Sequence, residues 1–254
     1  MKIVLPEYEN PIIKEAMSVC PDIDFIKADS LASACDILNR NEADALVAGI
    51  DITTRDVVLA CKENLKMTEK YFSSCFVMKR EEETIILADA GICKNPDAEI
   101  LKSIVIETYK TAKVVLNESP KIAMLSFSTF GSGGNDPSIE KIQEVIKKIK
   151  NEHPEIEIDG EMQLDVAIDK TVAKKKAPNS EVAGNANALI CPDLNVGNIL
   201  YKSMERFGGF TAAGPIIQGF RPLISDLSRG STKEDVVLVF RTLQKLHNNK
   251  NMLK

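Results

Sequence analysis

The segment at residues 121–159 reads KIAMLSFSTFGSGGNDPSIEKIQEVIKKIKNEHPEIEID and combines two apolar runs, a polar loop and a periodic stretch. Residues 121–127 form a short apolar run, which is typical of a buried strand. After the loop, Asp136 and Pro137 give a helix start signal, and one face of the following helix is apolar (Ile139, Ile142, Val145, Ile146 and Ile149). Residues 155–159 then predict the next strand.

The same alternation of short apolar runs and helical segments extends through the chain. Strands are predicted at 2–5, 24–27, 43–48, 74–78, 84–88, 121–127, 155–159 and 188–191. A helix is predicted at 97–116, and a final helix has an apolar face made by Val236, Val239, Phe240, Leu243 and His247. This pattern predicts an α/β fold with a parallel or mostly parallel sheet flanked by helices.

The amino-acid composition argues against several classes of function. The 254 residues carry a formal net charge of -5, which argues against a nucleic-acid-binding surface. No apolar run reaches the roughly 18 residues that a membrane span needs, and the first residues are typical of a strand rather than a secretion signal. The six cysteines are scattered and lack the paired spacing of metal sites. We therefore expect a cytoplasmic protein with reduced thiols, no membrane contact and no metal.

The loop at 126–135 lies between a predicted strand and a predicted helix. Its hydroxyls and amides, including those of Ser128, Thr129, Gly131 and Ser132, would converge on a helix amino end, a place that suits an anion. The alternative is a flexible turn with an ordinary helix cap. The loop is not a nucleotide-binding P-loop, because no Gly-Lys-Ser or Gly-Lys-Thr closes it.

A second polar run, 225–235, precedes the final helix. Here Arg229 could hold a phosphate through its planar fork, Asp235 could take a proton, and Ser228 could donate a hydrogen bond to a developing oxyanion. The structural alternative is a capping box, Thr232 with Asp235 or Ser231 with Glu234, with Arg229 paired to Asp226. Spacing alone favours this alternative. His153 and His247 lie in polar segments, and neither suggests a catalytic triad.

Sequence blocks in the second half resemble one enzyme family. They are DGEMQLD (159–165), KAPNSEVAGNAN (176–187), PDLNVGNI (192–199), GPIIQG (214–219) and DLSRG (226–230). Shorter blocks in the first half are LPE (5–7), ADALVAG (43–49), ADAG (88–91) and MLSFST (124–129). In order and spacing these blocks are similar to those of the phosphate acetyltransferase and phosphate butyryltransferase family, with the acetyl branch the closer.

The resemblance implies a fold and a reaction. It implies two α/β domains, 1–70 plus 220–254 and 71–219, across a cleft, as in isocitrate and isopropylmalate dehydrogenases. It also implies direct acyl transfer between coenzyme A and inorganic phosphate, with acyl-CoA as substrate, no permanently bound cofactor and a homodimer.

The resemblance also implies roles for individual residues. Asp235 corresponds to the base for the coenzyme A thiol, Arg229 to the phosphate-binding arginine, and Ser228 to the hydroxyl that stabilises the transition state. Positions expected to bind substrate are Ser128, Thr129, Gly131, Ser132, Arg55, Asn198 and Gln218.

Three departures separate this chain from typical members of the family. A large segment that carries an active-site arginine is missing between Val19 and Asp24. Leu59 stands where an arginine is usual, although Arg55 lies one helical turn earlier and could replace it. Phe130 and Asn185 occupy positions that are usually basic.

These departures keep other functions open. One alternative is a preference for butyryl or propanoyl groups. Another is a catalytically impaired homologue that binds coenzyme A or phosphate and has a regulatory role. A dehydrogenase is less well supported, because the chain has no nicotinamide-binding glycine fingerprint.

Overall fold

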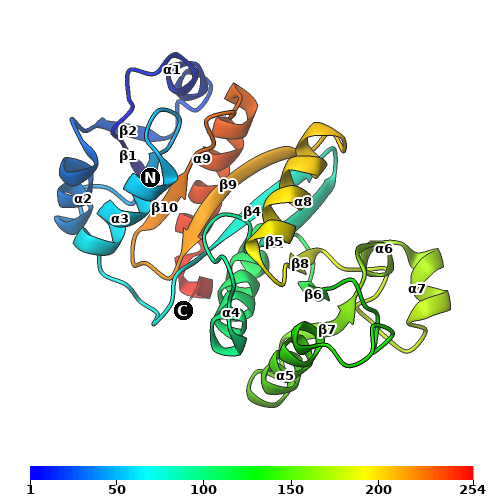
Figure 1. The fold of residues 1–254 in the computed structure, drawn as a ribbon. Helices are drawn as coiled ribbons and strands as arrows, with labels where there is room; N and C mark the ends of the chain where they lie inside the picture. The colour runs from blue at the N-terminus through cyan, green and yellow to red at the C-terminus, as the bar shows by residue number, and fades with distance from the viewer. Residues whose placement is uncertain (254) are drawn as a thin grey trace.

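A single mixed sheet forms the centre of the molecule, which is described here by a computed structural model covering residues 1–253 (Figure 1). Its strands are β1 (Lys2–Leu5), β2 (Asp24–Lys27), β3 (Ala45–Ala48), β4 (Ser73–Arg80), β5 (Glu83–Ala88), β6 (Lys121–Leu125), β7 (Glu157–Met162), β8 (Ala188–Ile190), β9 (Thr211–Gln218) and β10 (Leu223–Asp226). They pair in the order β2-β1-β3-β10-β9-β4-β5-β8-β6-β7.

Most strand pairs are parallel, as the sequence predicts. Antiparallel pairing is confined to the middle of the sheet, where β9 pairs with β10 and β4, and β4 pairs with β5. The pairs on either side of this region are all parallel. The expected α/β class with a mostly parallel sheet is therefore confirmed.

Helices cover both faces of the sheet. They are α1 (Pro11–Ser18), α2 (Leu31–Asn39), α3 (Thr54–Asn64), α4 (Ala98–Val115), α5 (Pro137–Glu152), α6 (Leu164–Ile168), α7 (Lys170–Lys176), α8 (Leu194–Arg206) and α9 (Lys233–Asn248), followed by the 3-10 turn η1 (Lys250–Leu253). One row, α1-α9-α4-α5, packs in succession and shares a large apolar core with the sheet. The other face is covered by α2 and α3 at one end and by α6, α7 and α8 at the other.

The first and last segments of the chain pack against each other. Strand β10 pairs with β3, so β9, β10 and α9 complete the part of the sheet that β1, β2 and β3 begin (Figure 1). The predicted first domain, residues 1–70 and 220–254, would contain β10 and α9 but not β9. Because the sheet continues through all ten strands, the division into two domains stays a prediction.

All eight predicted strands are present, six of them with shifted ends, but two further strands were not predicted. Strands β9 and β10, at 211–218 and 223–226, lie in a stretch where no strand was predicted. Gly214 and Pro215 interrupt the strand signal of β9. The register between β4 and β9 shifts between Cys75 and Val77, opposite this interruption, and Pro215, which has no N–H, is accommodated at the irregularity.

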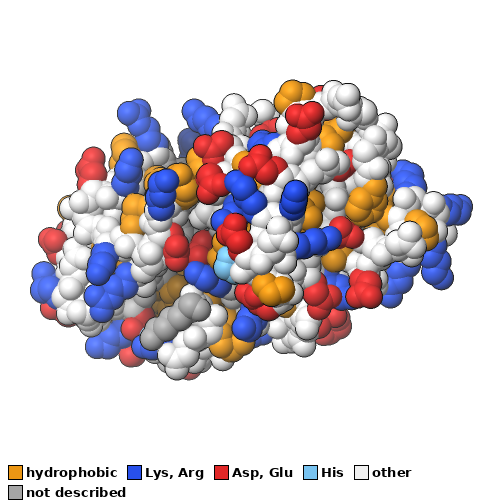
Figure 2. Space-filling model, turned by 90° about the horizontal axis from the view of Figure 1, so that it is seen from below, with side chains coloured by type: hydrophobic (Ala, Val, Ile, Leu, Met, Phe, Trp, Pro, Cys, Tyr) orange, Lys and Arg blue, Asp and Glu red, His pale blue; other side chains and the backbone are white. Residues whose placement is uncertain are grey.

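The surface mixes charges of both signs. Seen from below, Lys and Arg side chains are interspersed with Asp and Glu side chains (Figure 2). None of the helices within residues 1–253 combines the length and the apolar character that crossing a membrane requires. All six cysteines are free thiols, and only Cys93 is not fully buried.

Candidate active site

A cavity of about 420 Å³ lies where the loop between β10 and α9 faces helix α8. One side is made by the ends of β3 and β10 and the start of α3, which supply Gly49, Thr54 and Asp226. The other side is made by α8 through Asn198, Tyr201, Lys202 and Arg206. The cavity therefore lies between residues of the first predicted domain and residues of the second, at the carboxyl ends of β3 and β10.

The loop Asp226–Ser231 has a tight, internally bonded backbone. The Ser228 N–H donates to the Ser231 hydroxyl oxygen at 3.1 Å, and the Ser231 N–H donates to the Ser228 carbonyl at 2.9 Å. The Gly230 N–H donates to Ser228 Oγ at 3.3 Å. This last bond uses the hydroxyl as an acceptor, so its hydrogen can still be donated to a ligand in the cavity.

Arg229 is exposed beside the cavity and forms no ion pair with any residue of the described chain. The alternative in which Arg229 pairs with Asp226 is therefore wrong, since neither Asp226 oxygen has a partner within residues 1–253. An unpaired guanidinium keeps its planar fork available for a phosphate.

Two further cations from α8 reach the same cavity, and the sequence analysis did not identify them. Lys202 lies with its amine 4.6 Å from the centre of the Tyr201 ring. A Cβ added to Gly230 would lie 3.1 Å from Nη2 of Arg206, so that guanidinium packs against the Gly230 backbone. Both residues follow the PDLNVGNI block at helical spacing, a signal that could have identified them.

Asp235 is buried and serves as a helix cap. Its Oδ2 accepts hydrogen bonds from the N–H and the hydroxyl of Thr232, both at 2.8 Å, which completes the capping box at the start of α9. Its Oδ1 accepts the Ala212 N–H at 3.0 Å, so the carboxylate also ties α9 to β9. The capping box predicted as an alternative is confirmed, and Asp235 does not line the 420 Å³ cavity.

The loop at 126–135 already surrounds an anion, the carboxylate of Glu161 at the end of β7. Glu161 Oε1 accepts the Ser128 hydroxyl and the Gly131 N–H, both at 2.7 Å, and Oε2 accepts the Gln143 side-chain amide at 3.0 Å. Burial raises the pKa of Glu161, but these hydrogen bonds outweigh it and hold the pKa below its usual value.

The four residues predicted to bind substrate in this loop are thus engaged internally. Ser132 Oγ accepts the Thr129 N–H at 2.9 Å, and Thr129 Oγ1 accepts the Gln163 N–H at 3.1 Å. None of Ser128, Thr129, Gly131 and Ser132 lines the 420 Å³ cavity. The sequence correctly indicated a place that suits an anion, but its role in substrate binding stays a prediction.

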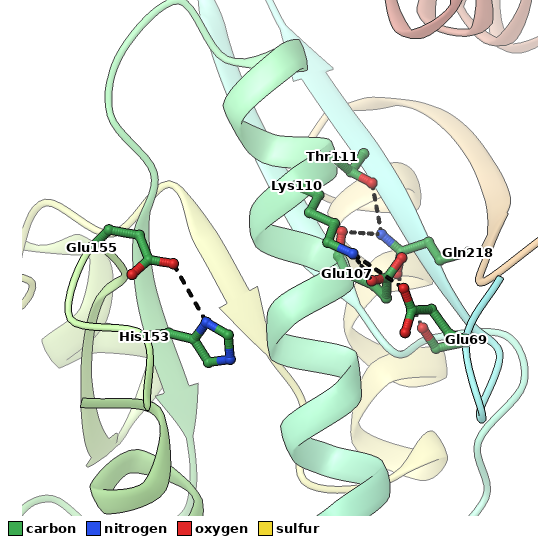
Figure 3. A network of polar contacts seen from close by, with 8 residues as sticks. Glu69, Glu107, Lys110, Thr111, His153, Glu155 and Gln218 are labelled. Atoms are coloured by element: carbon green, nitrogen blue, oxygen red, sulfur yellow. Dashed lines mark hydrogen bonds and ion pairs between the residues drawn. The ribbon is translucent and has the colours of Figure 1, made fainter. Parts of the chain in front are cut away.

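Gln218 lies at the end of β9 in a different part of the molecule. Its amide donates to Thr111 Oγ1 at 2.8 Å and to the Glu107 carbonyl at 3.0 Å, and Lys110 lies beside it between Glu107 and Glu69 (Figure 3). Gln218 Oε1 accepts the Ser73 hydroxyl at 3.1 Å. It borders a larger cavity of about 700 Å³ rather than the one beside Arg229.

The remaining predicted residues differ in their positions. Asn198, on α8, lines the 420 Å³ cavity, in agreement with a substrate-binding role. Arg55 is exposed in the first turn of α3, next to the cavity residue Thr54, and it does not itself line the cavity. His153 Nδ1 lies 3.4 Å from a Glu155 carboxylate oxygen (Figure 3). His247 Nδ1 lies 3.6 Å from an Asp44 carboxylate oxygen, and neither histidine lines this cavity.

Known proteins share this sequence and fold. Curated relatives include the phosphate acetyltransferase of Clostridium acetobutylicum, 48% identical over 159 residues that make up 63% of this chain and 47% of the relative. That of Buchnera aphidicola is 40% identical over 211 residues, which are 82% of this chain and 30% of the relative. The chain thus spans about half the length of the first curated relatives it matches, or less.

Solved structures confirm the fold. A phosphotransacetylase from Streptococcus pyogenes superposes with a TM-score of 0.85 at 30% identity, covering 97% of this chain and 94% of that one. A branched-chain phosphotransacylase from Enterococcus faecalis gives 0.84 at 21% identity, with coverage of 96% and 98%. A 4-hydroxythreonine-4-phosphate dehydrogenase from Klebsiella pneumoniae gives 0.51 at 12% identity, covering 88% of this chain and 69% of that one, which indicates a shared fold only.

The family model described as phosphate acetyl/butaryl transferase matches residues 13–241, a range that includes both sides of the cavity and the loop with Ser228 and Arg229. The chain therefore belongs to the phosphate acetyl/butaryl transferase family.

Proposed function

We propose that this chain is a phosphate acyltransferase that moves an acetyl or other short acyl group reversibly between coenzyme A and inorganic phosphate. The observation that carries the proposal is the position of Ser228 and Arg229, which lie at one cavity with Lys202 and Arg206 from α8. Both substrates are phosphate-bearing anions, and a cavity with several cations attracts them.

The geometry supports a direct transfer. Arg229 grips the phosphate through two parallel hydrogen bonds, and Ser228 donates a hydrogen bond to the oxygen of the carbonyl under attack. Lys202 and Arg206 offer charge to the phosphates of coenzyme A. These groups are in place before the substrates bind, and such preorganised charge is an effective way to stabilise a transition state.

Asp235 is the proposed base for the coenzyme A thiol, since a thiolate attacks far better than a thiol. Because Asp235 accepts three hydrogen bonds from Thr232 and Ala212, the start of α9 must loosen for the carboxylate to meet a thiol. If Asp235 is a catalytic base, substitutions of Asp235 and Thr232 should have different effects on turnover. If it is only a helix cap, their effects should be alike.

We expect Asp235→Asn to lower turnover by about 10²-fold, with a smaller loss of coenzyme A affinity, because the amide cannot take up the proton. Thr232→Ala is the matched control: it removes the two capping bonds of the Thr232 hydroxyl but keeps the carboxylate and its backbone donors. It should cost about 1 kcal/mol of stability and leave turnover within a few-fold of wild type. Thiol release and thermal unfolding measure the two effects. Equal losses of turnover in both variants would assign Asp235 to capping alone.

The acyl-transfer reaction itself is tested by thiol release from acetyl-CoA when phosphate is added. Turnover with acetyl-CoA, compared with propanoyl-CoA and butyryl-CoA, identifies the preferred acyl group. The second candidate is a homologue that binds coenzyme A or phosphate in a regulatory role, because Leu59 stands exposed on α3 where the family usually has an arginine. Absence of turnover at high protein concentration would favour that candidate.

Arg55 is the proposed substitute for that arginine. We expect Arg55→Ala to raise the KM for phosphate or coenzyme A by roughly 3- to 10-fold with little change in kcat, as for loss of one exposed cation near the site. Initial rates over a range of both substrates measure this effect. Unchanged KM values for both would remove Arg55 from the site.

The remaining proposals follow from the family. The chain works as a cytoplasmic homodimer of two-domain protomers, holds no cofactor permanently, and has acyl-CoA and phosphate rather than nucleic acid or membrane as its partners.

A further inference from the structure

Asp226, the last residue of β10, is the one side chain in the described wall of the cavity that is charged, buried and unpartnered. It is 1% exposed, and neither carboxylate oxygen has a hydrogen-bond partner of good geometry within residues 1–253, although the Thr54 hydroxyl lies near enough to lower its pKa. A buried carboxylate without a donor is costly, so natural proteins seldom keep one unless a ligand completes it.

Packing, rather than hydrogen bonding, fixes this carboxylate in place. A Cβ added to Gly49 would lie 2.3 Å from Asp226 Oδ1, so the carboxylate packs directly against the Gly49 backbone at the end of β3. Only glycine allows this approach, since Gly49 also has a φ of +114°. The position of the acid is thus determined while its lone pairs stay unused.

The groups around Asp226 make its ionisation difficult. Burial raises its pKa to about 7, the Thr54 hydroxyl on α3 opposes the shift, and Glu7 adds to it. The Glu7 carboxylate, in contrast, accepts backbone N–H groups from each of residues 49–52. Cys61 on α3 also lies near Asp226, and a hydrogen bond with Cys35, burial and the charge of Asp226 raise the pKa of its thiol. Lys202 and Arg206 lie on the α8 side of the cavity, and Arg229 follows Asp226 in the same wall.

The proposed reaction leaves one proton unassigned. Hydrogenphosphate must lose its O–H proton when its oxygen attacks the acyl carbon, and a base that serves the thiol does not account for it. Asp226 lies two residues before Ser228 and three before Arg229 in the same cavity wall. Both carboxylate oxygens are shielded from water, so a phosphate O–H reaches them only after a small shift of a neighbouring cavity residue such as Thr54.

We propose that Asp226 accepts the O–H of the hydrogenphosphate held by Arg229 and takes its proton during the transfer. This inference rests on the proposed function. As the phosphate O–H bond breaks, a bond forms between that oxygen and the acyl carbon, the carbon–sulfur bond breaks, and the sulfur leaves as thiolate. The thiolate then takes a proton from Asp235, and exchange with solvent water removes the proton from Asp226 and returns one to Asp235, which restores both groups. In the reverse direction, protonated Asp226 returns its proton to the leaving phosphate.

Selectivity between oxyanions follows from this role. Arginine and serine donors bind phosphate and sulfate alike, but at neutral pH sulfate carries no proton to donate to a carboxylate. Ionised Asp226 would therefore accept hydrogenphosphate and repel sulfate.

Calorimetric titration of the whole chain with inorganic phosphate and with sulfate, at pH 8, tests the inference. We expect the wild type to prefer phosphate by at least about 10-fold, the effect of one hydrogen bond to a charged group. Asp226→Asn should bind phosphate about 10-fold more weakly and sulfate more tightly. Ser225→Ala is the matched control, because the buried Ser225 hydroxyl bonds to the Pro215 carbonyl instead; it should keep the preference.

A second measurement uses no substitution. Sulfate should bind the wild type more tightly at pH 6 than at pH 8, and this difference should be absent in Asp226→Asn. An unchanged phosphate-to-sulfate ratio in Asp226→Asn, or a wild type that binds neither anion, would overturn the inference. Absence of acyl transfer in a wild type that keeps the preference would instead overturn only the proposed function, because both titrations are independent of turnover.

Discussion

Replacing Arg229 by alanine is expected to lower kcat/KM for acyl transfer by about 10²- to 10³-fold and to leave the melting temperature unchanged. The loss follows from removing the cation that grips the phosphate while charge moves through the transition state. Stability should not change, because Arg229 is exposed and forms no ion pair with the described residues. Thiol release and thermal unfolding of the same preparation measure both quantities.

Two comparisons sharpen this expectation. Arg229→Lys keeps the charge but loses the planar fork, so it should recover only part of the activity. Arg241→Ala removes a guanidinium from α9 that pairs with Asp22 at 2.7 Å, and it should keep full activity. If Arg229→Ala retained wild-type kcat/KM, the phosphate would have to be held elsewhere, and the cavity would no longer support the proposed reaction.

The sequence predicted the sheet well where apolar runs were uninterrupted. Strands β1 and β2 have the predicted bounds, and β6 begins at the predicted Lys121. Strand β9 was missed because Gly214 and Pro215 are residues typical of turns. Only the pairing of β9 with both β4 and β10 reveals why a strand tolerates them.

The candidate site was predicted in part for a similar reason. Ser228, Arg229 and Asn198 lie at one cavity, as the family resemblance led us to expect. The loop at 126–135 does surround an anion, but that anion is Glu161, which the parallel pairing of β6 with β7 brings to the loop. Sequence spacing cannot show that a distant carboxylate fills such a place.

The state of Asp226 could not be predicted from the sequence. In the sequence it stands three residues before an arginine, and an ion pair was the natural interpretation. Its burial, its contact with Gly49 and its missing partner depend on β10 lying beside β3, a long-range pairing. Functional residues that break a local rule in this way are recognisable only in the folded chain.

The pH dependence of stability provides a second large effect, at Asp226. Because its pKa is about 7 in the folded chain and near 3.8 when exposed, the folded state holds this proton more tightly than the unfolded state. The free energy of unfolding therefore falls by up to about 4 kcal/mol as the pH rises from about 4 to about 7. Asp226→Asn carries no charge, so at pH 8 it should melt several degrees above wild type.

At pH 5 the advantage of Asp226→Asn should be small, because wild-type Asp226 is then mostly protonated in the folded chain. Glu161→Gln gives the opposite sign: hydrogen bonds hold the Glu161 pKa below its usual value, so the wild-type carboxylate adds stability above about pH 4.5 and this variant should melt lower at pH 8. Melting curves of the three proteins from pH 5 to pH 8 make the comparison. If the melting temperatures of Asp226→Asn and wild type changed with pH in parallel, Asp226 would keep one protonation state from pH 5 to pH 8. It would then not exchange a proton with a substrate in that range. If Asp226→Asn instead gains stability at pH 8 and loses its preference for phosphate, the Asp226 carboxylate serves ligand binding and lowers the stability of the folded chain.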